Sequence, residues 1–345
     1  MNNSKNPAPG SPGQFSPWTS GAKTGIGRAL NTGSELSFTI GKGLLNEVYF
    51  PQEDTACIRE CGLVITGKGW LSDERTDTRH RGRMVRPGVP MYVLENKCVK
   101  GRYTLYKEIL ADPERDAVLQ RVRFEPGKEA GLSLHVYLTP HLHNSGQENE
   151  AWIDEYKGIT MLFASGGGLV LAMACDKGWK EWTVGYIGTS DGVTDLRANG
   201  RLTSHYDFAG PGQVQLCAAV GTAGTARKAA PGVPSEAKLD YRSGVGAPSG
   251  EAGIADRMEF VLAIGFGHTL EGAAHQAKSA LLGGFDEARQ KYCAQWDGWQ
   301  KDLWEKGKKR AIRGKYLKES AAALRISESR RYPGGVIASL SIPWG

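Results

Sequence analysis

The sequence has no long apolar run. No stretch approaches the roughly 18 consecutive apolar residues that a membrane-spanning helix needs. The first 17 residues hold prolines at positions 7, 9, 12 and 17 but no apolar core of the kind that a signal peptide carries. We therefore expect no membrane association and no visible export signal, which makes the chain cytoplasmic as written. The same composition predicts that residues 1–17 form a disordered or extended arm.

Cysteine and histidine are too sparse and too scattered to predict a metal site. Among the six cysteines only Cys57 and Cys61 lie close together, and they lack the second Cys or His pair of a zinc site. His141 and His143 alternate on one segment and could face one metal, but no third ligand stands at a diagnostic spacing. We predict buried free thiols, structural histidines, and neither a metal nor another cofactor.

Charge of one sign is not in great excess. The chain has 43 lysines and arginines against 37 acidic residues, a net charge of +6. Basic residues cluster at 75–86 and 306–315, but they lack the concentrated charge and interleaved aromatics that are typical of nucleic-acid surfaces. We interpret both clusters as solvated surface and expect no nucleic-acid partner.

Glycine and alternating apolar residues are what the sequence contains in quantity. The 46 glycines show no Gly-X-Y period, so they indicate many turns rather than collagen. Apolar and polar residues alternate with a period of two in segments such as 36–40, 132–138 and 260–266. The pattern predicts an all-β fold, a large antiparallel β-sandwich over residues 18–268 in which 221–256 form a long loop.

The period changes to that of helices after residue 268. Thr269 is a suitable cap for a first helix that ends near Gly283, and Asp286 for a second helix carrying Trp296 and Trp299. A third helix is expected near 311–329. We divide this part into a helical linker, residues 269–310, and the start of a second, helical domain, residues 311–345, which we expect to be truncated.

One or two amphipathic helices cannot bury their own apolar faces. Either they lie against the sandwich, or residues 296–344 leave an apolar patch through which the chain self-associates. On the second interpretation, a deletion ending near Phe266 should be monomeric and better behaved.

No motif specifies a reaction by its own chemistry. Gly25 and Gly27 lack the third glycine and the strand–helix context of a dinucleotide loop. A glycosidase needs two carboxylates placed across one sugar bond, and the sequence alone does not pair any of its acids, including Glu53, Asp54, Glu181, Asp191 and Asp195.

Several segments nevertheless resemble the bacterial-type glucoamylases and glucodextranases, the family 15 glycoside hydrolases. They are 18–27 (WTSGAKTGIG), 44–51 (LLNEVYFP), 140–142 (PHL), 185–192 (GYIGTSDG), 262–267 (LAIGFG) and 334–345 (GGVIASLSIPWG). The resemblance implies an N-terminal β-sandwich, a helical linker and a barrel of paired α-helices. It implies hydrolysis of α-glucans or malto-oligosaccharides from the non-reducing end, with inversion, by one glutamic acid and one glutamate.

The family's catalytic residues find no counterpart in this sequence. In the family, the Pro-Trp-Gly segment leads into a Trp-x-Arg-Asp element that binds the terminal sugar, and the glutamates follow later. We therefore carry over no catalytic residue and expect the chain alone to be inactive. Trp344 lies nearest to where a sugar site would begin and is the one candidate substrate contact. Val193 departs from the family, in which an aromatic residue often follows Ser-Asp-Gly.

Two other functions remain open at this point. Disaccharide phosphorylases share the sandwich-plus-barrel architecture and would add a phosphate-binding loop. The other is a non-enzymatic carbohydrate-binding or scaffold module. Four tryptophans could form its sugar-stacking platform: Trp70, Trp152, Trp179 and Trp182. Packing in the core is the simpler role for most of them.

Overall fold

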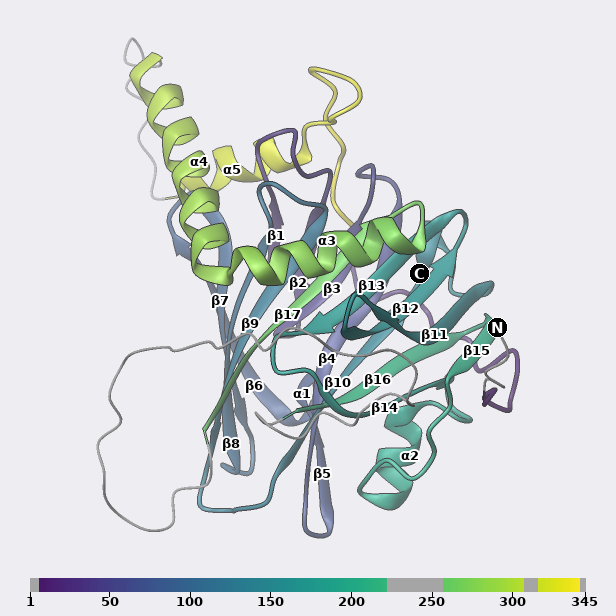
Figure 1. The fold of residues 1–345 in the computed structure, drawn as a ribbon. Coiled ribbons are helices and arrows are strands. Elements are labelled where there is room, and N and C mark those ends of the chain that lie inside the picture. Colours follow the sequence, from purple (N-terminus) through teal and green to yellow (C-terminus); the bar gives the residue numbers. More distant parts are fainter. Residues whose placement is uncertain (1–5, 222–256, 307–315, 342–345) are drawn as a thin grey trace.

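Two antiparallel β-sheets lie face to face and form the body of the molecule (Figure 1). The computed structural model describes residues 6–221, 257–306 and 316–341. Helices follow the last strand, so the predicted all-β sandwich with C-terminal helices is confirmed. The predicted loop beyond Gly221, the basic residues 307–315 and Trp344 lie outside the described residues.

The first sheet contains eight strands. Their bounds are β1 (Gly25–Arg28), β2 (Ser37–Gly41), β3 (Leu44–Tyr49), β4 (Ala56–Gly67), β5 (Trp70–Asp73), β10 (Ser133–Pro140), β14 (Trp179–Tyr186) and β16 (Val214–Val220). They are ordered β1-β2-β3-β4-β10-β16-β14, and β5 pairs with β4. Strands far apart in sequence are therefore neighbours, as in the pairing of β4 with β10.

The second sheet contains nine strands. Their bounds are β6 (Thr78–Arg86), β7 (Val89–Cys98), β8 (Tyr103–Ala111), β9 (Ala117–Pro126), β11 (Asn149–Tyr156), β12 (Ile159–Gly166), β13 (Leu169–Cys175), β15 (Phe208–Gly212) and β17 (Met258–Gly267). They are ordered β15-β11-β12-β13-β17-β9-β8-β7-β6. The last strand, β17, thus lies near the middle of the sheet, between β13 and β9.

Alternation along the strands builds the core between the sheets. The predicted apolar positions of β17 are all buried: Phe260, Leu262, Ile264 and Phe266. Residues that pair directly across antiparallel strands share a face, so Ile264 lies on the same side as Met173 and Val118. Hydrophobic burial between the two sheets is the main source of stability in such a layered fold.

The ion pair between Lys107 and Glu74 is fully buried inside this apolar core. Lys107 of β8 and Glu74 of the short helix α1 (Glu74–Asp77) are both fully buried, with Nζ 2.6 Å from Oε1. The Glu74 carboxylate also accepts hydrogen bonds from the Leu63 backbone N–H at 3.1 Å and the Asn96 amide at 2.5 Å. These bonds compensate the carboxylate for the water that it loses on burial.

From residue 6 onward the N-terminal arm lies extended along the sandwich, which is one of the two predicted alternatives for residues 1–17. The backbone N–H of Ala8 donates to Phe208 O at 2.8 Å, and that of Gln14 donates to Ile187 O at 2.8 Å. The backbone N–H of Gln213 in turn donates to Pro12 O at 2.7 Å. Proline cannot donate such bonds but its carbonyl accepts them, so a proline-rich segment can lie extended along a sheet edge.

One helix was not predicted from the sequence, and it begins at the end of the family-like segment 185–192. Asp191 caps α2 (Gly192–Asn199) by accepting a hydrogen bond from the Thr194 N–H, and Gly200 ends the helix in the left-handed conformation. Only Val193 and Leu196 give the helix buried apolar side chains, so its apolar periodicity is too short to stand out in the sequence.

The first C-terminal helix, α3 (Leu270–Gly283), lies across the outer face of the second sheet, over β13 and β17 (Figure 1). Thr269 caps it as predicted, accepting from the Gly272 N–H at 3.0 Å. Small residues form the contact. Gly265 lies so close to α3 that an added Cβ would stand 2.4 Å from the Ala273 carbonyl oxygen and 2.4 Å from the Ala277 nitrogen.

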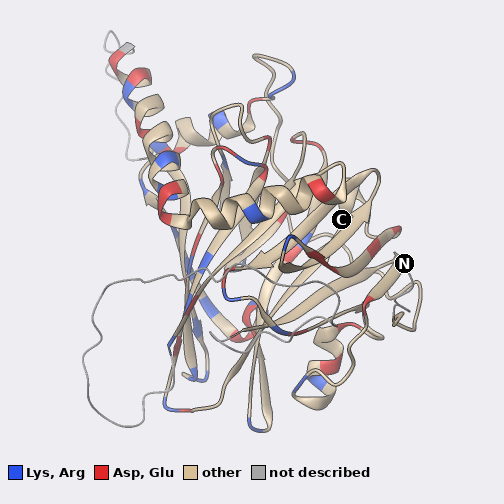
Figure 2. Ribbon diagram, in the orientation of Figure 1, with Lys and Arg blue, Asp and Glu red and all other residues tan. Residues whose placement is uncertain are grey.

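The second C-terminal helix, α4 (Phe285–Lys306), leaves the sheet at an angle to α3, and α5 (Leu317–Ser327) follows it (Figure 1). The predicted Asp286 cap is wrong, because α4 begins at Phe285 and Asp286 lies in its first turn. Its carboxylate instead contacts Arg121 of β9 at 2.8 Å. Figure 2 shows charges of both signs interspersed along α4, whereas α3 and most strands carry few. None of the helices in the described part of the chain is long and apolar enough to cross a membrane.

Candidate functional site

The carboxylates singled out in the sequence are held in structural contacts rather than paired across a cleft. Asp191 caps α2, and Asp195 accepts bonds from Asn199, Thr203 and Ser204. The His135 ring, with Nε2 3.9 Å from Oε1 of Glu181, lowers the pKa of Glu181. The pKa values of Asp195 and Glu181 are both lowered, whereas a catalytic acid needs a raised pKa.

Burial raises the pKa of two other carboxyls, Asp112 and Asp116, which lie in the turn between β8 and β9. Asp112 accepts from the backbone N–H of Glu114 at 2.9 Å, and Asp116 accepts from that of Glu35 at 2.6 Å. Both side chains therefore stabilise the turn.

The histidine and cysteine candidates do not form a metal centre. His141 is buried, whereas His143 is exposed and has a positive φ of 52° in the short 3₁₀ helix η1 (Leu142–Asn144). Cys57 and Cys61 are buried free thiols, and burial raises the pKa of each to about 12. No group of three or more potential metal ligands occurs among residues 6–221, 257–306 and 316–341.

The four tryptophans proposed as a sugar platform pack against the core at different places instead of forming one surface. Trp70 lies under the Arg102 guanidinium, 4.2 Å from the ring centre, and its indole N–H donates to Glu129 at 2.7 Å. Trp152 stacks on Phe163 with the ring centres 5.5 Å apart. Trp179 is buried, and Trp182 is partly buried against the same core.

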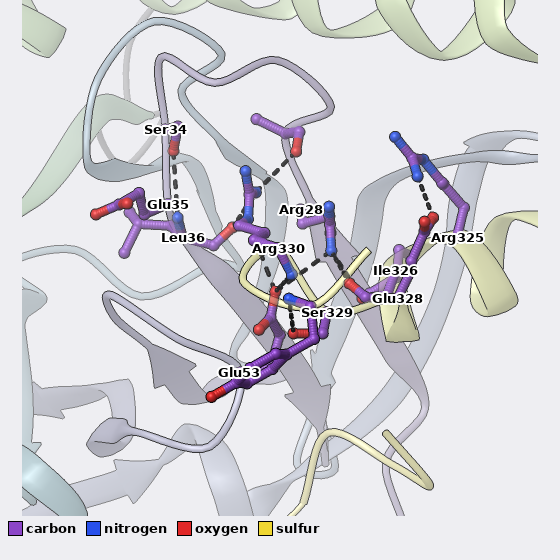
Figure 3. Close-up of polar contacts among 12 residues, drawn as sticks. Arg28, Ser34, Glu35, Leu36, Glu53, Arg325, Ile326, Glu328, Ser329 and Arg330 are labelled. Atoms are coloured by element: carbon purple, nitrogen blue, oxygen red, sulfur yellow. Dashed lines mark hydrogen bonds and ion pairs between the residues drawn. The ribbon is translucent and has the colours of Figure 1, made fainter. Parts of the chain in front are cut away.

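The most elaborate polar site joins the C-terminal helices to the sandwich (Figure 3). We call it the helix–sandwich junction and define it by Arg28 of β1, Glu53, Trp296 of α4 and Arg330. The Glu53 carboxylate accepts from the Arg330 backbone N–H at 3.1 Å. It lies 3.5 Å from the Arg28 guanidinium and 3.9 Å from that of Arg330. One carboxylate thus lies between two arginines that are far apart in sequence.

Backbone carbonyls complete the environment of the two arginines. Arg28 donates to the carbonyl oxygens of Ile326 and Glu328 at 3.3 and 2.5 Å, so strand β1 binds the end of α5. Arg330, which follows α5, donates back to the sandwich, to the carbonyl oxygens of Ala29 and Asn31 at 2.9 and 3.3 Å. Burial lowers the pKa of Arg28 to about 10 and lowers that of Arg330, and both remain cations at neutral pH.

Aromatic residues of α4 seal the apolar side of the junction. Tyr292 and Trp296 are fully buried. The Tyr292 hydroxyl donates to Pro90 O at 3.0 Å, and the Trp296 indole N–H donates to Arg28 O at 3.1 Å. The predicted stripe of aromatic residues is therefore a packing surface against the sandwich, and the first of the two interpretations of these helices holds for α3 and α4.

The sequence analysis missed Arg28 and Arg330 and treated Glu53 only as one of many acids. Local sequence offers no signal for them, because the partners are separated by about 300 residues, as in the bond between Arg28 and Glu328. What the junction can do is mechanical. The junction fixes the direction in which the chain leaves the sandwich. The four residues that define the junction include no nucleophile and no acid–base pair next to an open cavity.

Comparison with known proteins agrees with this architecture. The family described as "Glucodextranase, domain N" matches residues 8–231 and 242–301. A glucoamylase from Clostridium sp. (strain G0005) is 29% identical over 338 residues, which cover 97% of this chain and 43% of that protein. A crystal structure of a bacterial glucoamylase complexed with acarbose superposes with a TM-score of 0.82 at 28% identity, covering 100% of this chain and 46% of the other.

The chain therefore spans less than half the length of the relatives that it matches. The match with the solved structure includes both the sandwich and the helices that follow it, as the resemblance implied. Because the family match extends over most of the sequence, the chain belongs to the glucodextranase N-domain family, the N-terminal β-sandwich of family 15 glycoside hydrolases.

Proposed function

We propose that this chain is the N-terminal part of a glucoamylase-type hydrolase of α-glucans and that it does not itself carry the catalytic glutamates. The observation that supports this most is the match of the whole chain, helices included, to the bacterial glucoamylase crystal structure at 28% identity. In this proposal the sandwich is a supporting domain, and the helix–sandwich junction orients a helical catalytic domain.

The chemistry of inverting hydrolysis supports a sandwich that has no catalytic role of its own. One carboxylic acid must protonate the leaving oxygen while a carboxylate roughly 6.5–9.5 Å away activates a water molecule. The carboxylates described above are bound by arginines, backbone N–H groups or hydroxyls, and Glu53 in particular contacts both Arg28 and Arg330. Each of these contacts gives the carboxylate a structural role in the fold.

The first test is an activity assay on the purified chain with maltose, starch and dextran, in which released glucose is measured. We expect no release above that of a heat-denatured sample, and the Clostridium glucoamylase serves as the positive control. Glucose release that co-purifies with the chain through successive columns would contradict the proposal.

A second arm of the assay adds inorganic phosphate and measures glucose 1-phosphate. A phosphate-dependent product would assign the chain to the phosphorylase class instead. The supporting role predicts no product in either arm.

A further inference from the structure

A pocket lined by buried polar side chains lies beside the N-terminal arm. Its volume is about 410 Å³, within the range of about 300–1,000 Å³ typical of small-ligand sites. Residues 15–18 of the arm form one wall, the turn at 144–147 forms another, and His141 and Gln213 lie at its base. We call it the Trp18 pocket.

The base of the Trp18 pocket holds two buried polar side chains without partners. His141 is 2% exposed, and neither Nδ1 nor Nε2 forms a hydrogen bond within the described part of the chain. Gln213 is 5% exposed, and its Oε1 likewise has no partner there. A buried polar group that forms no hydrogen bond costs about 1–3 kcal/mol, so several such atoms lining one pocket call for a ligand.

Gly146 lies directly against these buried atoms. A Cβ at this position would stand 2.5 Å from His141 Nε2 and 2.7 Å from Gln213 Oε1. Any larger residue would therefore occupy the space next to both polar groups. The glycine thus provides a specific way to fill the pocket without removing either hydrogen-bonding side chain.

The walls favour a ligand with an apolar face. The Trp18 and His141 rings meet edge to face, with their centres 4.6 Å apart. Phe15 is 72% exposed and lines the same pocket. Aromatic side chains contribute large apolar contact surfaces to binding sites.

The polar groups favour an uncharged ligand rich in hydroxyls. Burial, with added repulsion from Arg59, lowers the pKa of His141 to about 3, so the ring is neutral and can donate through one nitrogen and accept through the other. Asp54 is the one charged residue among those that line the pocket, and no lysine or arginine is among them. A phosphate or another anion would lack a counter-charge here.

We propose that the Trp18 pocket binds the pyranose ring of a neutral sugar, which presents hydroxyls to His141 and Gln213 and an apolar face to the aromatic wall. That the sugar is the terminal unit of an α-glucan rests on the proposed function. The sandwich then contributes a sugar-binding site of its own in addition to its supporting role.

Isothermal titration calorimetry of the full chain tests this with three probes: maltotriose, xylotriose and adenosine monophosphate. We expect saturable binding of maltotriose with a Kd on the order of 1 mM. Binding of xylotriose alone would support the pocket but contradict the α-glucan assignment. Binding of adenosine monophosphate alone, or of none of the probes, would overturn the sugar site.

Three variants locate the binding. Trp18→Ala and Gly146→Val should each weaken binding at least tenfold, about 1.4 kcal/mol. His141→Leu should also weaken it, while leaving the thermal stability unchanged or higher, because it removes a buried imidazole without partners. Arg197→Ala, at a largely exposed side chain paired with Asp73 outside the pocket, is the matched control and should bind as wild type. Unchanged affinity in the first two variants would overturn the proposal.

Discussion

At the scale of single residues, the buried polar groups distinguish this sandwich from a purely apolar one. Arg28 and Lys107 occupy positions that the strand pattern alone would assign to apolar side chains, and each is stabilised by a partner distant in sequence. The sequence pattern predicted buried cysteines and a buried face for each strand. It could not predict ion pairs, because these depend on which strands become neighbours.

The Lys107–Glu74 pair gives the first prediction. Lys107→Met leaves the Glu74 carboxylate buried without its cation, and breaking such a pair costs about 3–5 kcal/mol. Urea unfolding should show this loss. In the double variant Lys107→Met, Glu74→Gln the loss should be smaller than the sum of the two single losses, because no charge remains buried. Additive losses would contradict the coupling.

His141 predicts how stability depends on pH. Its pKa is about 3 in the folded chain and about 6.5 when unfolded, so between these values the unfolded state binds a proton that the folded state excludes. Stability should therefore fall as the pH falls below 6.5, by up to about 1.4 kcal/mol per pH unit from this group.

The matched variant for this prediction is His141→Leu, which cannot titrate. The difference in the free energy of unfolding between wild type and variant should grow in favour of the variant from pH 7 to pH 4.5. A difference that stays constant over this range would show that His141 is accessible to protons in the folded protein.

At the scale of elements, local sequence patterns predict the strands and the first C-terminal helix. They do not predict the boundaries of these elements or the contacts between them. The period-two alternation predicted β2, β10 and β17, and Thr269 predicted the start of α3. Helix α2 was missed because its stability comes from contacts with β14 and β16 rather than from its own periodicity. Local propensity competes poorly with such tertiary contacts.

The close packing of α3 on β17 gives a prediction at this scale. Gly265→Ala should destabilise the chain by about 1–3 kcal/mol, because the new Cβ meets backbone atoms of α3 that cannot rotate away. Gly298→Ala is the control, since it lies in α4 with open space around it and should stabilise the helix by about 0.5–1 kcal/mol. Thermal unfolding of the two variants measures both effects, and equal shifts would contradict the packing argument.

At the scale of the whole molecule, the helices and the sandwich form a single packed structure. Trp296 is buried against β1, and Arg330 binds the carbonyls at the end of that strand. This changes the expectation for a chain cut at residue 266. Removing the helices uncovers the outer face of β17 and the apolar surroundings of Trp296.

A deletion ending at Gly267 should therefore aggregate or unfold at a lower temperature than the full chain, rather than become better behaved. Size-exclusion chromatography with light scattering compares the two. A monomeric deletion with an unchanged melting temperature would show that the helices are dispensable to the sandwich. That the full chain self-associates through its C-terminal part stays a prediction. The same light-scattering measurement gives the molar mass that tests it.

The central claim is that the junction makes sandwich and helices one cooperative unit. Hydrogen exchange followed by mass spectrometry in increasing urea tests it most directly, on the wild type and on Arg330→Met. In the wild type, peptides from α4 and α5 should lose protection together with those from β1 and β17, and in the variant they should lose it earlier. Helical peptides that exchange fully in wild type without urea, while the strands stay protected, would contradict it.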